Sequence, residues 1–97
     1  MEFIQIIEFT ARDIGAVRKL QDDYRRATNG KNTIRGEILT RDRNDPRRYF
    51  NLVFFDSYES AMQNSHLPET QADFENYKPV LDGPPVFYDL DVLDDRR

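Results

Sequence analysis

The only histidine of the sequence, His66, is the first candidate for chemistry. Histidine titrates near neutral pH, so His66 could act as a general base or as an axial metal ligand. Asn64 lies two residues earlier, beside the same expected helix break, and is a second candidate catalytic residue. One histidine alone makes no zinc site, because zinc sites need three or four ligands. The alternative interpretation of His66 is a surface loop residue without a chemical role.

Four polar residues at odd positions of apolar segments form a second group of candidates: Gln5, Tyr49, Asn51 and Asp89. Buried polar groups need hydrogen-bond partners, and polar groups that converge on an apolar cavity are typical of ligand sites. The sequence therefore predicts that these four bind a ligand. The alternative is a hydrogen-bonded network across a subunit interface, and the residue types do not separate the two interpretations.

Asp89 and Asp91 are two residues apart, which places both carboxylates on one face of a strand. Paired carboxylates can exchange protons with a substrate. Alternatively, they form ion pairs, for which Arg35 and Arg41 are the expected partners.

Composition excludes several classes of function. The chain has no cysteine, which rules out disulfides, thiolate catalysis and cysteine-based zinc sites. Its net charge is −4, which disfavours binding to nucleic acids and to anionic membrane surfaces. No apolar run approaches the roughly 20 residues of a membrane span, and the first residues do not resemble a signal peptide. A cytoplasmic protein of one domain, residues 1–97, is expected.

Hydrophobic patterns predict the elements that must position the candidate residues. Apolar residues recur at helical spacing after Asp13, a good helix N-cap, and Asn29 and Gly30 should end that helix. A second helix should be capped by Asp56 or Ser57, and Pro68 should begin a third. The helices are expected over residues 13–28, 57–64 and from 68 onward, and the strands over 2–10, 33–41, 48–55 and 86–93.

This order of elements is β-α-β-β-α-β, if the two later helices count as one crossover. Two right-handed crossovers around one hairpin give an α+β, ferredoxin-like fold. The predicted sheet is antiparallel, with strand order 4-1-3-2. Strand 33–41 carries Arg35, Glu37 and Arg41, and such charges are typical of an edge strand.

Both faces of the predicted sheet are rich in large apolar side chains. The even positions are almost all apolar, so we expect this face to pack under the helices, joined by Ile34 and Ile38 of the second strand. The odd face would then stay open, and burial of one such side chain is worth roughly 1.5–3 kcal/mol. We therefore predict a homodimer through the odd face. The apolar residues of that face are Phe3, Ile7, Phe9, Val53, Phe55 and Phe87.

Two segments carry a resemblance to a known family. The segment 49–62, YFNLVFFDSYESAM, and the motif Phe-x-Asp-Leu-Asp-Val at 87–92 resemble the dimeric α/β-barrel superfamily. Within it, the similarity is greatest to antibiotic-biosynthesis-monooxygenase-like proteins. That family includes cofactor-independent monooxygenases of polycyclic phenols and haem-degrading enzymes. Its enzymes typically use a tryptophan near the end of the third strand. This sequence has none, and Asp56 stands at about that position.

The resemblance implies a small apolar or phenolic ligand, held between the sheet and the helices or inside the barrel, and no cofactor. A noncatalytic assembly or regulatory module of the same fold is the alternative, and a haem-binding protein with His66 as ligand is a third. An open apolar cavity with Gln5, Asn51 or His66 inside it would favour the first hypothesis. A solidly packed interior would favour the second.

Overall fold

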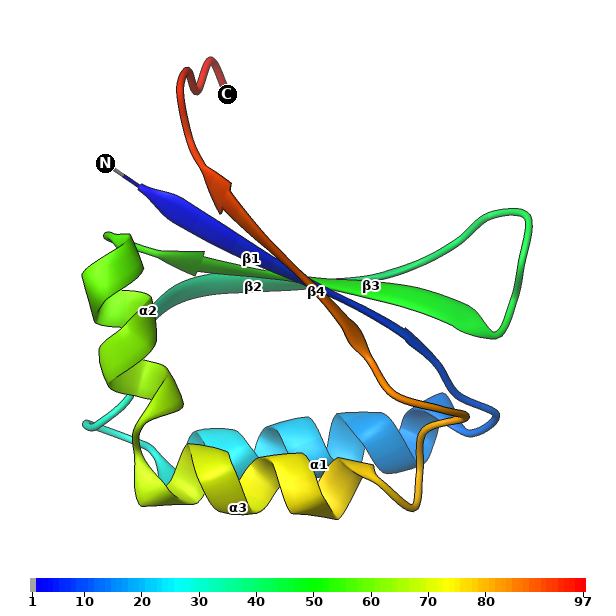
Figure 1. The fold of residues 1–97 in the computed structure, drawn as a ribbon. Helices are drawn as coiled ribbons and strands as arrows, with labels where there is room; N and C mark the ends of the chain where they lie inside the picture. The colour runs from blue at the N-terminus through cyan, green and yellow to red at the C-terminus, as the bar shows by residue number, and fades with distance from the viewer. Residues whose placement is uncertain (1) are drawn as a thin grey trace.

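The computed structural model describes residues 2–97 and shows one four-stranded sheet with three helices on one side (Figure 1). The sheet is antiparallel with order β2-β3-β1-β4, which is the predicted order read from the other edge. The chain therefore has the predicted α+β, ferredoxin-like topology. In chain order the elements are β1 (Phe3–Thr10), α1 (Ile14–Ala27), β2 (Ile34–Arg41), β3 (Arg48–Phe55), α2 (Tyr58–Ser65), α3 (Pro68–Tyr77) and β4 (Val86–Asp91).

The helix ends follow from local side chains. The Asp13 carboxylate accepts a hydrogen bond from the Ala16 amide at 3.3 Å, as expected for the N-cap of α1. Of the two predicted caps of α2, Asp56 and Ser57, the structure has Ser57, which forms a capping box with Ser60 because each serine hydroxyl accepts a hydrogen bond from the backbone amide of the other. Pro68 opens α3 at a position where its missing N–H needs no partner.

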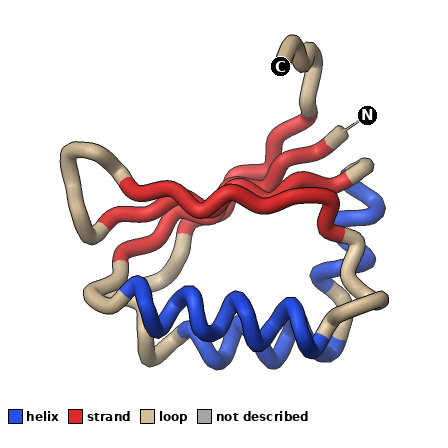
Figure 2. Tube along the Cα trace, turned by 180° about the vertical axis from the view of Figure 1, so that it is seen from behind, coloured by secondary structure: helices blue, strands red, loops and turns tan. Residues whose placement is uncertain are grey.

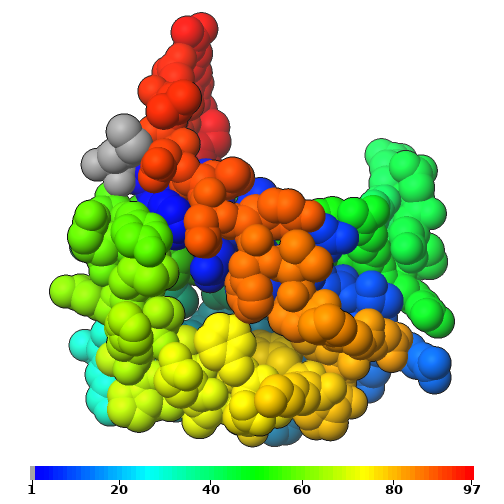
Figure 3. Space-filling view, in the orientation of Figure 1, coloured from blue at the N-terminus to red at the C-terminus, as the bar shows by residue number. Residues whose placement is uncertain are grey.

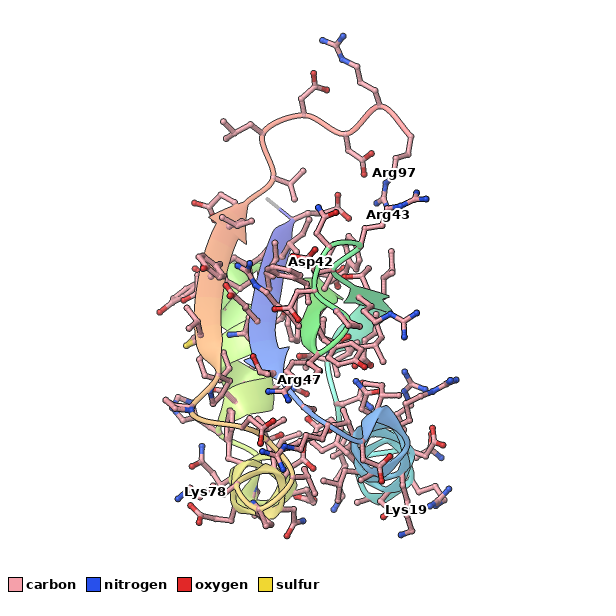
Figure 4. All side chains as sticks on the ribbon, turned by 90° about the vertical axis from the view of Figure 1, so that its right-hand side faces the viewer. Lys19, Asp42, Arg43, Arg47, Lys78 and Arg97 are labelled. Carbon is pink, nitrogen blue, oxygen red and sulfur yellow. The ribbon has the colours of Figure 1, made fainter. Side chains whose placement is uncertain are left out.

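The helices form a second layer that covers one face of the sheet. α1 and α3 pack side by side, and α2 stands at one end, where it packs on β3 and connects the sheet to α3 (Figures 1 and 2). Figure 4 looks along α1 and α3, and shows Lys19 and Lys78 on the outer sides of these two helices. The interior is therefore bounded by the sheet, by the two antiparallel helices α1 and α3, and by α2 at one end.

The helices cover the odd face of the sheet, so our assignment of the two faces is wrong. Phe3, Phe9, Tyr49 and Phe55 are each at most 7% exposed, because they lie beneath the helices. The even face is open. Of its residues, Ile38, Tyr88 and Leu90 are more than 40% exposed, and Ile4, Ile6, Phe50, Leu52 and Phe54 are partly exposed.

The alternation of side chains along strand β2 is shifted by one residue at a β-bulge. Ile34 pairs with Phe55 but Gly36 pairs with Phe54, so Arg35 is the extra residue. The bulge places Ile34 on the covered face, while Ile38 stays on the open face. The prediction that both isoleucines share one face is therefore wrong, because it assumed unbroken alternation.

The buried core consists of two clusters at opposite ends of the covered face. One contains Phe3, Val53, Phe55 and Ala61, under α2. The other contains Phe9, Ala11, Val17 and Tyr49, near the start of α1. Because the aromatic residues fill the two ends, the middle of the layer is left for smaller and polar side chains.

The ends of the molecule protrude from this body. The turn between β2 and β3 extends beyond the sheet, and its residues 43–47 are exposed. After β4, residues 92–97 form neither helix nor strand and leave the sheet as an arm (Figures 1 and 3). None of the helices in residues 2–97 combines the length and the apolar character needed to cross a bilayer.

Candidate ligand-binding cavity

A cavity of about 610 Å³ lies between the covered face of the sheet and the helices. This volume is within the range of small-molecule sites. The walls are mostly apolar, with contributions from every strand and helix and from the turn before β4. The interior is therefore open, not packed solid.

The mouth of the cavity lies between α3 and β4. Phe74 and Phe87 line the cavity, yet each is still about two-fifths exposed, at 41% and 42%. Their rings meet edge to face, with centroids 5.9 Å apart. In the space-filling view a hollow opens between α2, α3 and β4, with atoms of the strands visible at its floor (Figure 3). A flat apolar molecule could enter past this aromatic pair.

The floor of the cavity carries Asn51, from the middle of β3. Asn51 is 6% exposed, and its Nδ2 donates a hydrogen bond to Glu37 Oε1 at 2.8 Å. The second oxygen of Glu37 accepts from Arg25 at 3.1 Å. A carboxylate can only accept, so the amide nitrogen must face it and Oδ1 must point elsewhere. Asn51 Oδ1 is buried and has no hydrogen-bond partner in the described residues 2–97.

A second polar group joins the three helices. Tyr24 of α1 shares a 2.7 Å hydrogen bond with the hydroxyl of Thr70 and accepts another from Asn64 Nδ2 at 3.0 Å. Asn64 also accepts from the backbone amide of Thr33 through Oδ1. These three side chains line the cavity, but their polar atoms bind one another. Their evident role is to fix the helix layer.

Asp73 and Tyr77 of α3 complete the polar lining. Burial raises the pKa of the Asp73 carboxyl to about 7, and the nearby charge of Glu37 adds to this shift. Burial also raises the pKa of the Tyr77 phenol, with further contributions from Asp73 and Glu37. Tyr77 is therefore a neutral hydroxyl in the physiological range, while Asp73 changes protonation within it.

The structure brings three of the six candidate residues to the cavity: Gln5, Asn51 and Asn64. Tyr49 lies under the helices but belongs to the core, where its ring stacks on Phe9 at 5.4 Å. Asp89 is exposed on the edge strand and accepts a 3.3 Å hydrogen bond from Gln5 Nε2. All four strand candidates share the covered face, as their odd numbers require.

His66 lies elsewhere. It is the exposed C-cap of α2 and is not among the residues that line the cavity. A catalytic role at this cavity therefore finds no support in its position.

The expected ion pairs of Asp89 and Asp91 are also not formed in residues 2–97. β2 and β4 are opposite edges of the sheet, so Arg35 cannot reach Asp89 and binds Asp56 at 2.6 Å.

Sequence reasoning missed Glu37 and Asp73. A signal for Asp73 exists, since Thr70, Asp73 and Tyr77 follow each other at spacings of three and four and share one helix face. An acid on that buried stripe is unusual and could have been noticed. For Glu37 the charge alone indicated an edge strand. Its cavity position required knowledge of which face the helices cover.

The comparisons with known proteins agree with this geometry at the level of the fold. No protein-family model matches the sequence, and no curated protein sequence matches it. Solved structures do match. A protein of Caulobacter crescentus assigned as an antibiotic biosynthesis monooxygenase superposes with a TM-score of 0.81 at 16% identity, over 96% of this chain and 91% of that one. The chain has the fold of the antibiotic biosynthesis monooxygenases.

Two further structures are similar over nearly their whole length. Rv0793 of Mycobacterium tuberculosis matches with a TM-score of 0.79 at 17% identity, over 100% of both chains. SnoaB of Streptomyces nogalater, a cofactor-independent oxygenase, matches with a TM-score of 0.80 at 9% identity, over 97% of this chain and 95% of that one. At such low identity the likeness establishes the fold and leaves the chemistry to the residues of the cavity.

Proposed function

We propose that the protein binds a small aromatic hydroxy compound in the cavity and oxygenates it without a cofactor. The observation that carries this proposal is the combination of an apolar cavity of about 610 Å³ with the buried, unpaired Oδ1 of Asn51 at its floor. A buried acceptor without a donor is costly, and a ligand hydroxyl would remove that cost once a small shift of the Asn51 side chain, which lines the cavity, exposes Oδ1. The same fold in the cofactor-independent oxygenase SnoaB supports the choice of reaction.

The chemistry needs only a site that makes the ligand electron-rich. Loss of a proton converts a phenol into an anion that can give an electron to O2. In the overall reaction a phenol and O2 give a quinone and water. One oxygen atom becomes the new carbonyl, the hydrogens of the ring C–H and the hydroxyl leave with the other oxygen as water, and the phenol supplies all four electrons. The aromatic walls, Phe74 and Phe87 among them, would hold the rings by stacking, and Asn51 would orient the hydroxyl. Gln5 extends the polar floor toward Asp89.

Oxygen uptake tests the reaction and ligand binding tests the cavity. Purified protein is mixed with a panel of polycyclic phenols in an oxygen electrode, and product is followed by mass spectrometry. We expect uptake with at least one three-ring phenol, and its loss in Asn51→Leu. If no phenol of the panel caused oxygen uptake while fluorescence quenching still showed binding, the oxygenase hypothesis would be contradicted. The protein would then be a noncatalytic binding module.

We propose further that the protein works as a homodimer through the open face of the sheet. Three strands of eight residues and one of six, about 4.8 Å apart with a rise of about 3.3 Å per residue, give roughly 500 Å² per copy, hence roughly 1,000 Å² for a pair. This is the lower limit for a specific interface. A second copy suits the face because apolar residues from all four strands occupy it, including Ile6, Ile38, Leu52 and Leu90.

The polar groups of the open face are already paired, which permits burial against another copy. Glu8 accepts hydrogen bonds from Arg48 Nε at 2.9 Å and from the Tyr88 hydroxyl at 2.8 Å. Arg48 also lies over the Phe50 ring, 5.1 Å from its centroid. Sedimentation at micromolar concentration tests the dimer, and a well-folded monomer would contradict it.

A further inference from the structure

The carboxyl group of Asp73 stands apart from the other polar groups of the cavity. Glu37 is held by Asn51 and Arg25, and Tyr24 is held by Thr70 and Asn64. Asp73 lines the cavity but makes no hydrogen bond or ion pair through its side chain within residues 2–97. It is partly buried on the inner face of α3, one residue before Phe74 at the mouth. A carboxyl group in this position is available to a ligand.

A second observation points to the same ligand chemistry. Asn51 Oδ1, on the opposite wall, is a buried acceptor without a donor. The cavity thus carries two unpaired acceptors, an amide oxygen on β3 and a carboxyl on α3, and the carboxyl lies close to the charge of Glu37. A ligand O–H group can donate to such an acceptor, whereas a ligand carboxylate would be repelled by Asp73 and Glu37.

We propose that Asp73 accepts the hydroxyl proton of the bound ligand, and that the cavity therefore selects uncharged aromatic hydroxy compounds over their carboxylate analogues. In this step the ligand O–H bond breaks, its electron pair stays on the ligand oxygen, and the proton forms a new O–H bond on the Asp73 carboxylate. The ligand becomes an aryloxide and Asp73 a neutral acid. The inference rests on the proposed binding of aromatic hydroxy compounds and is independent of the reaction with O2.

The charged and titratable groups around Asp73 set the pH at which it can act. Glu37 faces it from β2 and favours the protonated form. From α1, Arg25 binds Glu37, and both Tyr24 and Arg25 act on the neighbouring Tyr77. Tyr77 and Lys78 belong to the same stretch of chain as Asp73 and also line the cavity. Lys78 binds Glu75 on the outer side of the helix at 2.9 Å and does not neutralise Asp73. Asp73 should therefore become a competent base as the pH rises through about 7.

The test uses 2-naphthol, because excited naphthol passes its proton to an adjacent base and then emits at longer wavelength as naphtholate. Bound to the wild-type protein, it should show naphtholate emission that grows as the pH rises through about 7. In Asp73→Asn, which keeps the size of the side chain, naphthol should still bind but emit as the neutral form at every pH. Asp73→Glu should restore part of the naphtholate emission.

Controls separate this inference from the binding proposal. Glu75→Gln removes a carboxylate from the same helix, on its exposed side, and should behave as wild type. 2-Naphthoate should bind the wild type about ten-fold more weakly than 2-naphthol, and Asp73→Asn should narrow that ratio. Equal emission profiles in wild type and Asp73→Asn would overturn the role of Asp73 while leaving the cavity as a ligand site. Failure of 2-naphthol to bind any variant would overturn both.

Discussion

The two faces of the sheet are similar in hydrophobicity and opposite in how their polar groups are used. On the open face, Arg48 and Tyr88 both donate hydrogen bonds to the Glu8 carboxylate. In the cavity beneath the covered face, Asn51 Oδ1 of β3 and the Asp73 carboxyl of α3 have no protein partner within residues 2–97. Paired polar groups permit a surface to be buried against a second copy, whereas unpaired ones need a ligand.

This contrast shows that apolar content alone does not identify the inner face of a sheet. The even residues are the more uniformly apolar set, and they remain open, as expected for a face that a second copy would cover. The odd face mixes large aromatics at its ends with Gln5 and Asn51 in its middle. A mixture of that kind is what a ligand cavity requires.

The largest effect should come from a charge on the open face. Leu52→Asp, on the central strand β3, places a carboxylate in each half of the proposed interface. Since burial of each leucine is worth roughly 1.5–3 kcal/mol, the dimer dissociation constant should rise roughly 100-fold or more. Analytical ultracentrifugation measures this, with the exposed helix substitution Gln63→Asp as control. An unchanged dimer would place the interface elsewhere.

Removal of the paired carboxylate on the open face should reduce stability and leave ligand binding in the cavity unchanged. Glu8→Ala deletes the acceptor of both Arg48 and Tyr88 and should lower the free energy of unfolding by about 2 kcal/mol. Urea denaturation measures the change, with Glu59→Ala at an exposed position as control. Naphthol affinity should stay the same, and a large loss of affinity would show that the two faces are coupled.

The matching change on the covered face should reduce ligand affinity as well as stability. Asn51→Leu removes the unpaired oxygen, so ligand affinity should fall about ten-fold, and it also removes the hydrogen bond to Glu37, so the free energy of unfolding of the ligand-free protein should fall by about 1.5 kcal/mol. Fluorescence titration gives the affinity. Thr40→Val, which removes a hydroxyl bond to the Phe50 carbonyl, is the control and should leave affinity intact. Equal losses in both variants would argue against a specific contact at Asn51.

The smallest effect concerns pH. The pKa of Asp73 is raised from 3.8 to about 7 in the folded state, so the folded protein holds a proton that the unfolded chain has already released. Stability should therefore fall as the pH rises between these values and level off above about 7. After allowance for solvent screening of this partly exposed group, Asp73→Asn should be more stable than wild type by about 1 kcal/mol at about pH 8, and equal to it below the lower value. If the free energy of unfolding depended on pH in the same way in both proteins, the pKa of Asp73 would not be raised by folding.

Much of the fold could be predicted because local signals agreed with one another. Asp13 and Pro68 marked helix starts, strand 48–55 was placed to the residue, and the crossover rule gave the strand order. The residues of the candidate site could be predicted from the sequence only in part. Gln5 and Asn51 stood out as polar residues in apolar strands, and both line the cavity. Asp73 was missed although it lies on the same helix face as Thr70 and Tyr77, and Glu37 could not be found because its place in the cavity depends on which face of the sheet the helices cover.

The sequence by itself determined the order of elements, the topology and the presence of two apolar faces, because these depend on short-range pattern and on chain handedness. Only the tertiary structure decided which face the helices cover. Alternation along a strand divides its residues between two faces but does not show which face the helices cover. A single bulge at Arg35 also moves Ile34 from one face to the other. The meeting of Asn51, Glu37 and Asp73 in one cavity was decided at the same level, since it requires three elements to be docked in register.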